Sequence, residues 1–182
     1  MNIVEPIRTK EKVEEIYKFL TEKNKRDALL FLFGIYTGLR ISDILKFRVK
    51  DCFKKYYNIR EMKTGKQKVY DWNPFLKREI DKYIEGKEPD EYVFKSRKGR
   101  NQPITRYRAY KIIKTACNTC GVYNVGTHTL RKTFGLFLYE QSEKNIGMIM
   151  DILNHSSENI TLRYIGIQQE KNNSVMKKMR YF

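Results

Sequence analysis

The chain has 182 residues, enough to bury a substantial core as one domain without disulfides or a structural metal. Hydrophobic residues make up 41% of it, which argues against disorder, and no apolar run approaches the roughly 20 residues that cross a bilayer. The net charge is +16, and residues 46–114 alone contain 21 Lys and Arg against 9 Asp and Glu. This concentration of positive charge favours a polyanionic partner, nucleic acid before a membrane surface.

The first part of the chain predicts helices and then a hairpin. Hydrophobic periodicity indicates a helix over residues 10–23 and a more buried one over 25–37, which Gly38 ends. Ser42 is expected to cap a short third helix. Aromatic and extended-type residues on either side of a Thr-Gly pair predict strands over 56–62 and 68–72.

The remainder predicts helices separated by short loops, one of which is strongly basic (KSRKGRNQP). Thr127 is expected to cap or precede the third of these helices. The fold class is therefore mainly α with a small antiparallel β-sheet (α+β). The predicted helices cover residues 74–85, 105–120, 127–139, 145–153, 158–165 and 168–180.

Three cysteines, Cys52, Cys117 and Cys120, are too few for a disulfide framework and fit a reducing compartment. The C-x-x-C pair would suit a redox centre or half of a zinc site. Both cysteines, however, fall on the apolar stripe of the helix over 105–120, which favours burial as small hydrophobes. We expect no metal and no cofactor. The chain start lacks the apolar core of a secretory signal, so a cytoplasmic protein is expected.

The histidines and their surroundings suggest phosphodiester chemistry. His128 and Arg131 share a helix face, and His155 follows a helix end nine residues before Tyr164. Arg40 lies just after a helix. Two arginines can clamp the nonbridging oxygens of a phosphodiester, and a histidine can accept the proton of an attacking tyrosine.

Lys63, at the hairpin tip, completes this set, because a long amine there can protonate the departing 5′ oxygen. Lys66 is close enough in sequence to be an alternative donor. Together these residue types would cut DNA without a metal ion.

Three segments resemble the motifs of tyrosine recombinases, the phage integrase family. TGLRISDILKFRVKD is similar to the first-arginine motif, HTLRKTF to the H-x-x-R motif, and LNHSSENITLRYI to the motif that ends in the nucleophile. The spacings agree: 23 residues from the first arginine to the hairpin lysine, 24 from the second arginine to the second histidine, and nine to the tyrosine. The resemblance assigns catalytic roles to Arg40, Lys63, His128, Arg131, His155 and Tyr164.

Two positions depart from the family pattern. Asn154 stands where glycine is usual, and asparagine tolerates a left-handed backbone better than other residues. Lys132 stands where many members have histidine. Asp43 matches an acidic position of the family, and the resemblance implies that this side chain orients the active-site cations.

The resemblance implies a site-specific recombinase that cuts double-stranded DNA through a 3′-phosphotyrosine and works as a homotetramer on two DNA sites. Residues 1–182 would form one catalytic domain, with no N-terminal core-binding domain detected, as in short inversion-type recombinases, or a fragment of a longer protein. Two alternatives stay open: a non-catalytic DNA-binding regulator and a type IB topoisomerase-like enzyme. Expected phosphate contacts come from Lys66, Arg97, Lys98, Arg100, Arg108 and Lys111.

The last predicted helix has a small apolar face formed by Val175, Met176, Met179 and Phe182. This face would either pack on its own domain or, as the resemblance favours, dock on a neighbouring protomer.

Overall fold

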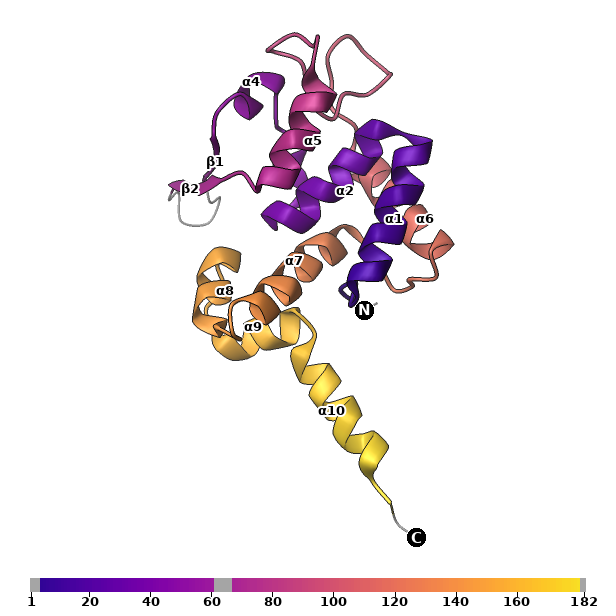
Figure 1. Cartoon of the computed structure of the whole chain (residues 1–182), viewed down its shortest axis with the longest axis vertical. Helices are drawn as coiled ribbons and strands as arrows, with labels where there is room; N and C mark the ends of the chain where they lie inside the picture. Colours follow the sequence, from indigo (N-terminus) through magenta and orange to yellow (C-terminus); the bar gives the residue numbers. More distant parts are fainter. Residues whose placement is uncertain (1–3, 61–66, 181–182) are drawn as a thin grey trace.

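The structure, a computed structural model, describes residues 4–60 and 67–180 and is mostly helical, with one small antiparallel sheet (Figure 1). This agrees with the predicted fold class. In chain order the elements are α1 (Lys10–Lys23), α2 (Lys25–Thr37), α3 (Ile41–Ile44), α4 (Val49–Cys52), β1 (Tyr56–Arg60), β2 (Gln67–Asp71), α5 (Pro74–Ile84), α6 (Arg106–Thr119), α7 (Thr127–Gln141), α8 (Ile146–Leu153), α9 (Glu158–Tyr164) and α10 (Ile167–Lys178).

Local capping explains the bounds of the first two helices. The side chains of Thr9 and Asn24 accept hydrogen bonds from the first-turn amides of α1 and α2. Gly38 ends α2 in the left-handed conformation, with φ 61°. A Cβ there would also lie 2.2 Å from the ring of Phe134, so both the turn and the packing against α7 require glycine.

Two predicted caps were wrong. Ser42 lies inside α3, because Arg40 is the N-cap residue and its carbonyl accepts from the amides of Asp43 and Ile44. Thr127 is the first residue of α7, and Gly126 is its N-cap. The short helix α4 was not predicted, since four residues are too few to show a hydrophobic period. The hairpin pairs Tyr56 with Asp71, and the predicted continuation of β1 to residue 62 lies outside the described residues.

The buried side chains form two clusters. The larger one surrounds Phe31, Phe33 and Phe94, and it joins α1, α2, α5, α6 and the start of α7. The smaller cluster, formed by Leu136, Ile149, Leu153 and Ile165, holds α8 and α9 on the C-terminal half of α7. Helix α7 therefore connects two packed bodies, and residues at the seam between them can be drawn from both.

The three cysteines are buried and unpaired, which confirms the core interpretation of Cys117 and Cys120. Burial raises the pKa of the Cys117 thiol to about 12. A thiol of this kind is a poor nucleophile and a poor metal ligand at neutral pH.

Helix α10 projects away from the rest of the molecule, as Figure 1 shows. Val175 is 65% exposed and Met176 is 67% exposed, so this apolar face does not pack on the described part of its own domain. Phe182, predicted on the same face, lies outside the described residues. No described helix is long and apolar enough to span a membrane.

Candidate active site

Five of the six predicted catalytic residues lie together at the seam between the two bodies. Arg40, His128 and Arg131 line one cavity of about 560 Å³, and Tyr164 contacts both histidines. Lys63 and Lys66 lie outside the described residues. The convergence arises because α3, α7, the end of α8 and α9 all meet at this seam.

Arg131 ties the two bodies together. Its side chain is nearly buried, and one Nη donates to the carbonyl of Gly38 at the end of α2. The other Nη donates to the carbonyl of Leu153 at the end of α8, over 2.8 Å. These two bonds fix the orientation of the guanidinium, and its other N–H groups can be directed at an anion in the cavity.

The cavity also has a wall that was not predicted. Arg106, Tyr107 and Tyr110, from the first turns of α6, line it together with Arg40 and His128. The sequence carried a weak signal for them: two tyrosines interleaved with cations on the polar side of the striped helix. Such a pattern suits contact with nucleic acid, since a tyrosine ring can stack and a guanidinium can bind phosphate.

Tyr164 lies beside a proton acceptor and two cations. Its Oη is 3.4 Å from Nδ1 of His128, the outer limit of a hydrogen bond. Burial raises the pKa of Tyr164, and the positive charges of Arg131 and Arg40 act in the opposite direction. Burial and the same two arginines lower the pKa of His128, so the imidazole is mostly neutral near pH 7.

His155 is held in one tautomer by Thr161. The Thr161 hydroxyl donates a hydrogen bond to the carbonyl of Ser157 at 3.0 Å. With its one hydrogen used in this way, the hydroxyl accepts a hydrogen bond from Nδ1 of His155, which lies 3.1 Å away. The neutral imidazole therefore carries its proton on Nδ1 and leaves Nε2 open. Burial, and then Arg131 and Arg40, lower its pKa. The ring packs edge-on against Tyr164, with centroids 4.9 Å apart.

The turn before His155 keeps the predicted geometry. Asn154 is the C-cap residue of α8 and adopts the left-handed conformation with φ 52°, so asparagine does replace glycine there. This turn directs the His155 ring toward Tyr164.

Two further charged side chains, Lys132 and Asp43, lie near the site. The ammonium of Lys132 lies 5.2 Å from the centroid of the Tyr164 ring. Asp43 forms an ion pair with Lys46 at 3.3 Å, and its negative charge also acts on Arg131. The role predicted for Asp43, orienting the cations, remains a prediction.

The five predicted phosphate-binding cations that the structure describes are exposed but occupy two different places. Arg108 and Lys111 lie on α6 next to the cavity wall, and Lys111 lies 4.8 Å from the centroid of the Tyr107 ring. Arg97, Lys98 and Arg100 lie on the basic loop and are not among the residues that line the cavity.

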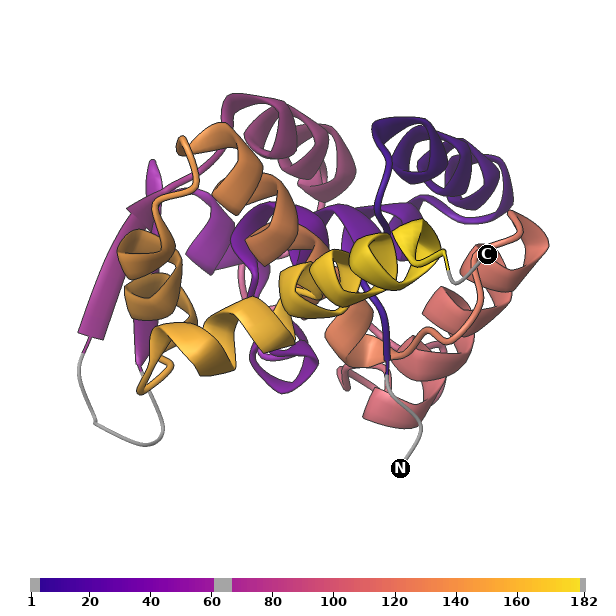
Figure 2. The ribbon, with the colours of Figure 1, turned by 90° about the horizontal axis from the view of Figure 1, so that it is seen from below.

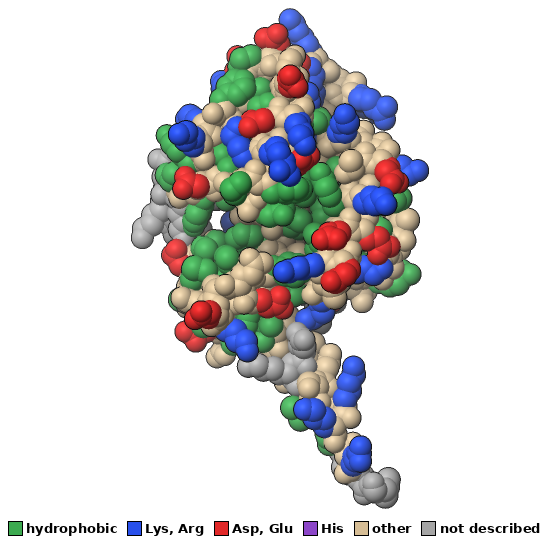
Figure 3. Space-filling view, viewed as in Figure 1, with side chains coloured by type: hydrophobic (Ala, Val, Ile, Leu, Met, Phe, Trp, Pro, Cys, Tyr) green, Lys and Arg blue, Asp and Glu red, His purple; other side chains and the backbone are tan. Residues whose placement is uncertain are grey.

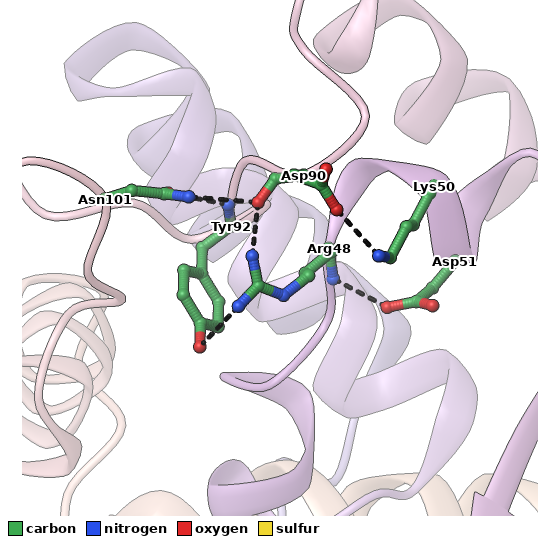
Figure 4. Close-up of polar contacts among 6 residues, drawn as sticks. All are labelled: Arg48, Lys50, Asp51, Asp90, Tyr92 and Asn101. Atoms are coloured by element: carbon green, nitrogen blue, oxygen red, sulfur yellow. Dashed lines mark hydrogen bonds and ion pairs between the residues drawn. The ribbon is translucent and has the colours of Figure 1, made fainter.

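A polar network anchors the basic loop to α4 (Figure 4). Asn101 donates to the carbonyl of Asp90, and its amide oxygen accepts from the backbone of Tyr92. Arg48 donates to the same carbonyl and lies over the Tyr92 ring at 4.4 Å, while Lys50 pairs with the Asp90 carboxylate. The loop therefore presents its cations from a fixed base.

The chain is similar to known proteins along nearly its whole length. The model of the phage integrase family matches residues 7–171. The chain is 46% identical over 178 residues to the probable integrase/recombinase YoeC of Bacillus subtilis, covering 97% of each chain. It is 30% identical to a tyrosine recombinase of Pseudothermotoga lettingae, covering 90% of this chain and 58% of that protein.

Solved structures share the fold. The crystal structure of XerA recombinase has a TM-score of 0.71 at 18% identity, over 98% of this chain and 68% of the other. A lambda integrase dimer bound to a COC′ core site has a TM-score of 0.67 at 19% identity, over 91% of this chain and 49% of the other.

Proposed function

The chain belongs to the phage integrase family of DNA-cutting and DNA-rejoining enzymes, and on that premise we propose that Tyr164 is its nucleophile. The observation that carries the proposal is the position of the Tyr164 hydroxyl, 3.4 Å from a histidine nitrogen and close to two arginines. The adjoining cavity of about 560 Å³ is lined by cations and has room for a phosphodiester.

In the proposed reaction the Tyr164 oxygen attacks phosphorus. The bond from Oη to phosphorus forms as the bond from phosphorus to O5′ breaks, leaving a 3′-phosphotyrosine and a free 5′ hydroxyl. His128 in its neutral form accepts the tyrosine proton, and Lys63 supplies a proton to O5′. A 5′ hydroxyl from another strand reverses these steps, so the strands are exchanged with no net loss of a high-energy bond.

The cations stabilise the charge that develops on phosphorus. Arg40 and Arg131 bind the nonbridging oxygens, which gain negative charge in the transition state. Burial, and then repulsion from Arg131 and Arg40, lower the pKa of His155, and the negative charge of a bound phosphate acts in the opposite direction, so that His155 joins them. Its Nε2 then gains a proton and donates, while Nδ1–H stays bonded to Thr161.

We further propose that the partner is double-stranded DNA and that four copies assemble on two DNA sites. Solved neighbours include XerH bound to a difH substrate, which makes DNA the first candidate. The exposed apolar face of α10 supports exchange of this helix between copies. A groove of about 400 Å³ that includes Ile35, Phe134 and Phe137 could receive it, and Figure 3 shows hydrophobic side chains gathered on that face.

Residues 1–182 would then act as the catalytic domain, in the cytoplasm where bacterial and mobile-element DNA is found. Comparing the products of a supercoiled plasmid that carries two candidate sites would separate recombination from simple relaxation.

The nucleophile is tested by trapping the adduct on a nicked DNA substrate that loses its 5′ fragment after cutting. Tyr164→Phe should form no covalent adduct and should keep its affinity for DNA. Tyr123→Phe, at a tyrosine that is 66% exposed, is the matched control and should react normally. A Tyr164→Phe adduct at wild-type yield would refute the assignment. Tight DNA binding without any wild-type adduct would favour the non-catalytic regulator.

A further inference from the structure

The segment before α1 runs past the junction between α9 and α10 (Figure 2) and connects three parts of the molecule. The amide of Glu5 donates to the carbonyl of Asn124 in the loop before α7, over 2.9 Å. The amide of Ile7 donates to Oγ1 of Thr133 on α7, over 2.8 Å, and the Ile7 side chain is 1% exposed in the larger core. The segment is therefore anchored firmly to the larger body.

Its other contact is with the turn directly after Tyr164. Arg8 Nη2 lies 3.4 Å from the carbonyl oxygen of Gly166, and the same nitrogen pairs with the Glu5 carboxylate at 3.1 Å. Gly166 has φ 84°, and a Cβ there would lie 2.9 Å from Arg8 and 3.5 Å from the ring of Pro6. The turn thus lies directly against the ring and the guanidinium, and its positive φ favours glycine.

The segment also acts through charge on Lys132, which lies beside the Tyr164 ring. The pKa of Lys132 is lowered, mainly by burial and also by the positive charge of Arg8. The negative charge of Glu5 acts in the opposite direction. The Lys132 ammonium lies over the Tyr164 ring. Glu5 therefore favours the charged form of the lysine that lies over this ring, while Pro6 and Arg8 contact the turn that follows Tyr164 in the chain.

We propose that residues 5–8 are an N-terminal clamp that holds Tyr164 in position for attack, with Arg8 as a positioning residue. The clamp links the larger body to the smaller body, in which Tyr164 lies. Helix α10 leaves the molecule at Gly166, so a force on α10 acts first on the turn that the clamp holds. The clamp opposes that displacement and keeps the hydroxyl near His128.

The proposal rests on Tyr164 as the nucleophile, and its test uses three variants of the full chain. Arg8→Ala removes the guanidinium, Arg8→Lys keeps a cation that can reach the carbonyl, and Lys18→Ala removes an exposed cation from α1 as the control. Each is measured for DNA affinity, for single-turnover adduct formation at saturating DNA, and for hydrogen exchange. The informative amides are those of Ile165 and Gly166, which donate to Thr161 and Arg163.

Arg8→Ala should slow adduct formation about 10-fold or more, because a small displacement of a reacting atom is costly, and should leave DNA affinity unchanged. The two amides should exchange faster while the core of α7 does not, and Arg8→Lys should recover most of the rate. Rates and exchange equal to those of Lys18→Ala would overturn the clamp. So would a loss of rate that follows a loss of affinity, or faster exchange throughout α7.

Failure of the clamp and failure of the proposed chemistry give different results. If the wild-type protein forms an adduct at Tyr164 and the Arg8 variants match it, only the clamp is wrong. If the wild-type protein forms none, the nucleophile is wrong, and exchange at Ile165 and Gly166 still reports whether Arg8 holds the turn.

Discussion

Replacing Thr161 with valine tests the hydrogen bond that orients His155. Thr161 is fully buried, and its hydroxyl accepts from His155 Nδ1 while donating to the Ser157 carbonyl. Valine fills nearly the same volume but neither donates nor accepts. The Ser157 carbonyl keeps a partner, because it also accepts from the Thr161 amide at 3.2 Å. The lost interaction therefore falls mainly on the histidine.

The size of the effect follows from the exposure of His155. A buried donor left without an acceptor costs about 1–3 kcal/mol, and the His155 ring is only partly buried, so water can replace part of the bond. We expect the lower half of that range. If the cost appears fully in the transition state, about 1.4 kcal/mol corresponds to a roughly tenfold slower cleavage. The free energy of unfolding should fall by about 1 kcal/mol.

The assay is single-turnover adduct formation at saturating DNA, with Thr161→Ser as the matched control. Serine keeps the hydroxyl and loses only a methyl group, so it should cleave at close to the wild-type rate. Ring nitrogen shifts of His155 in an NMR spectrum should show the Nδ1–H tautomer in the wild type and a mixture in the valine variant. Equal cleavage defects in both variants, or none in either, would refute the argument.

Four other outcomes are expected. Lys63→Ala should slow cleavage of normal DNA but not of a substrate with a 5′-bridging sulfur, whose leaving group needs no proton; equal defects would move the role to another donor. In the DNA-free protein both histidines should titrate by NMR below the ordinary pKa of 6.5. Because the unfolded chain then binds protons first, these two groups should reduce stability as the pH falls below that value. Neutralising Arg97, Lys98 and Arg100 together should weaken binding to all DNA sequences and flatten its salt dependence; a loss confined to one sequence would instead indicate base reading. Deleting residues 170–182 should leave a folded DNA-binding protein that is poor in strand exchange, and normal recombination would argue against docking of α10.

Much of the fold could be predicted from short-range signals. The bounds of α1 and α2 follow from Thr9, Asn24 and Gly38, because a cap is a contact between residues a few positions apart. The errors at Ser42 and Thr127 have the same origin. A side chain that could cap a helix is common, and the register of the preceding turn decides whether it does.

In the candidate site, too, the sequence predicts some features and the packing of the helices decides others. The residue types and spacings of the three motifs are present in the sequence, and they predict His128, Arg131 and Tyr164 as catalytic residues. The spacing does not say that the Tyr164 hydroxyl lies 3.4 Å from one histidine and that its ring packs edge-on against the other. Those distances depend on how α7 and α9 pack.

Only the tertiary structure decided which residues far apart in the chain are in contact. Arg131 bonds to carbonyls at the ends of α2 and α8, Arg106 faces the cavity from α6, and Arg8 reaches Gly166 across 158 positions. Local propensity carries no information about such pairs, because they form when two separate hydrophobic cores pack against one helix, α7. The sequence by itself determined the chemistry that the chain can perform, and the packing determined where that chemistry is placed and what holds it there.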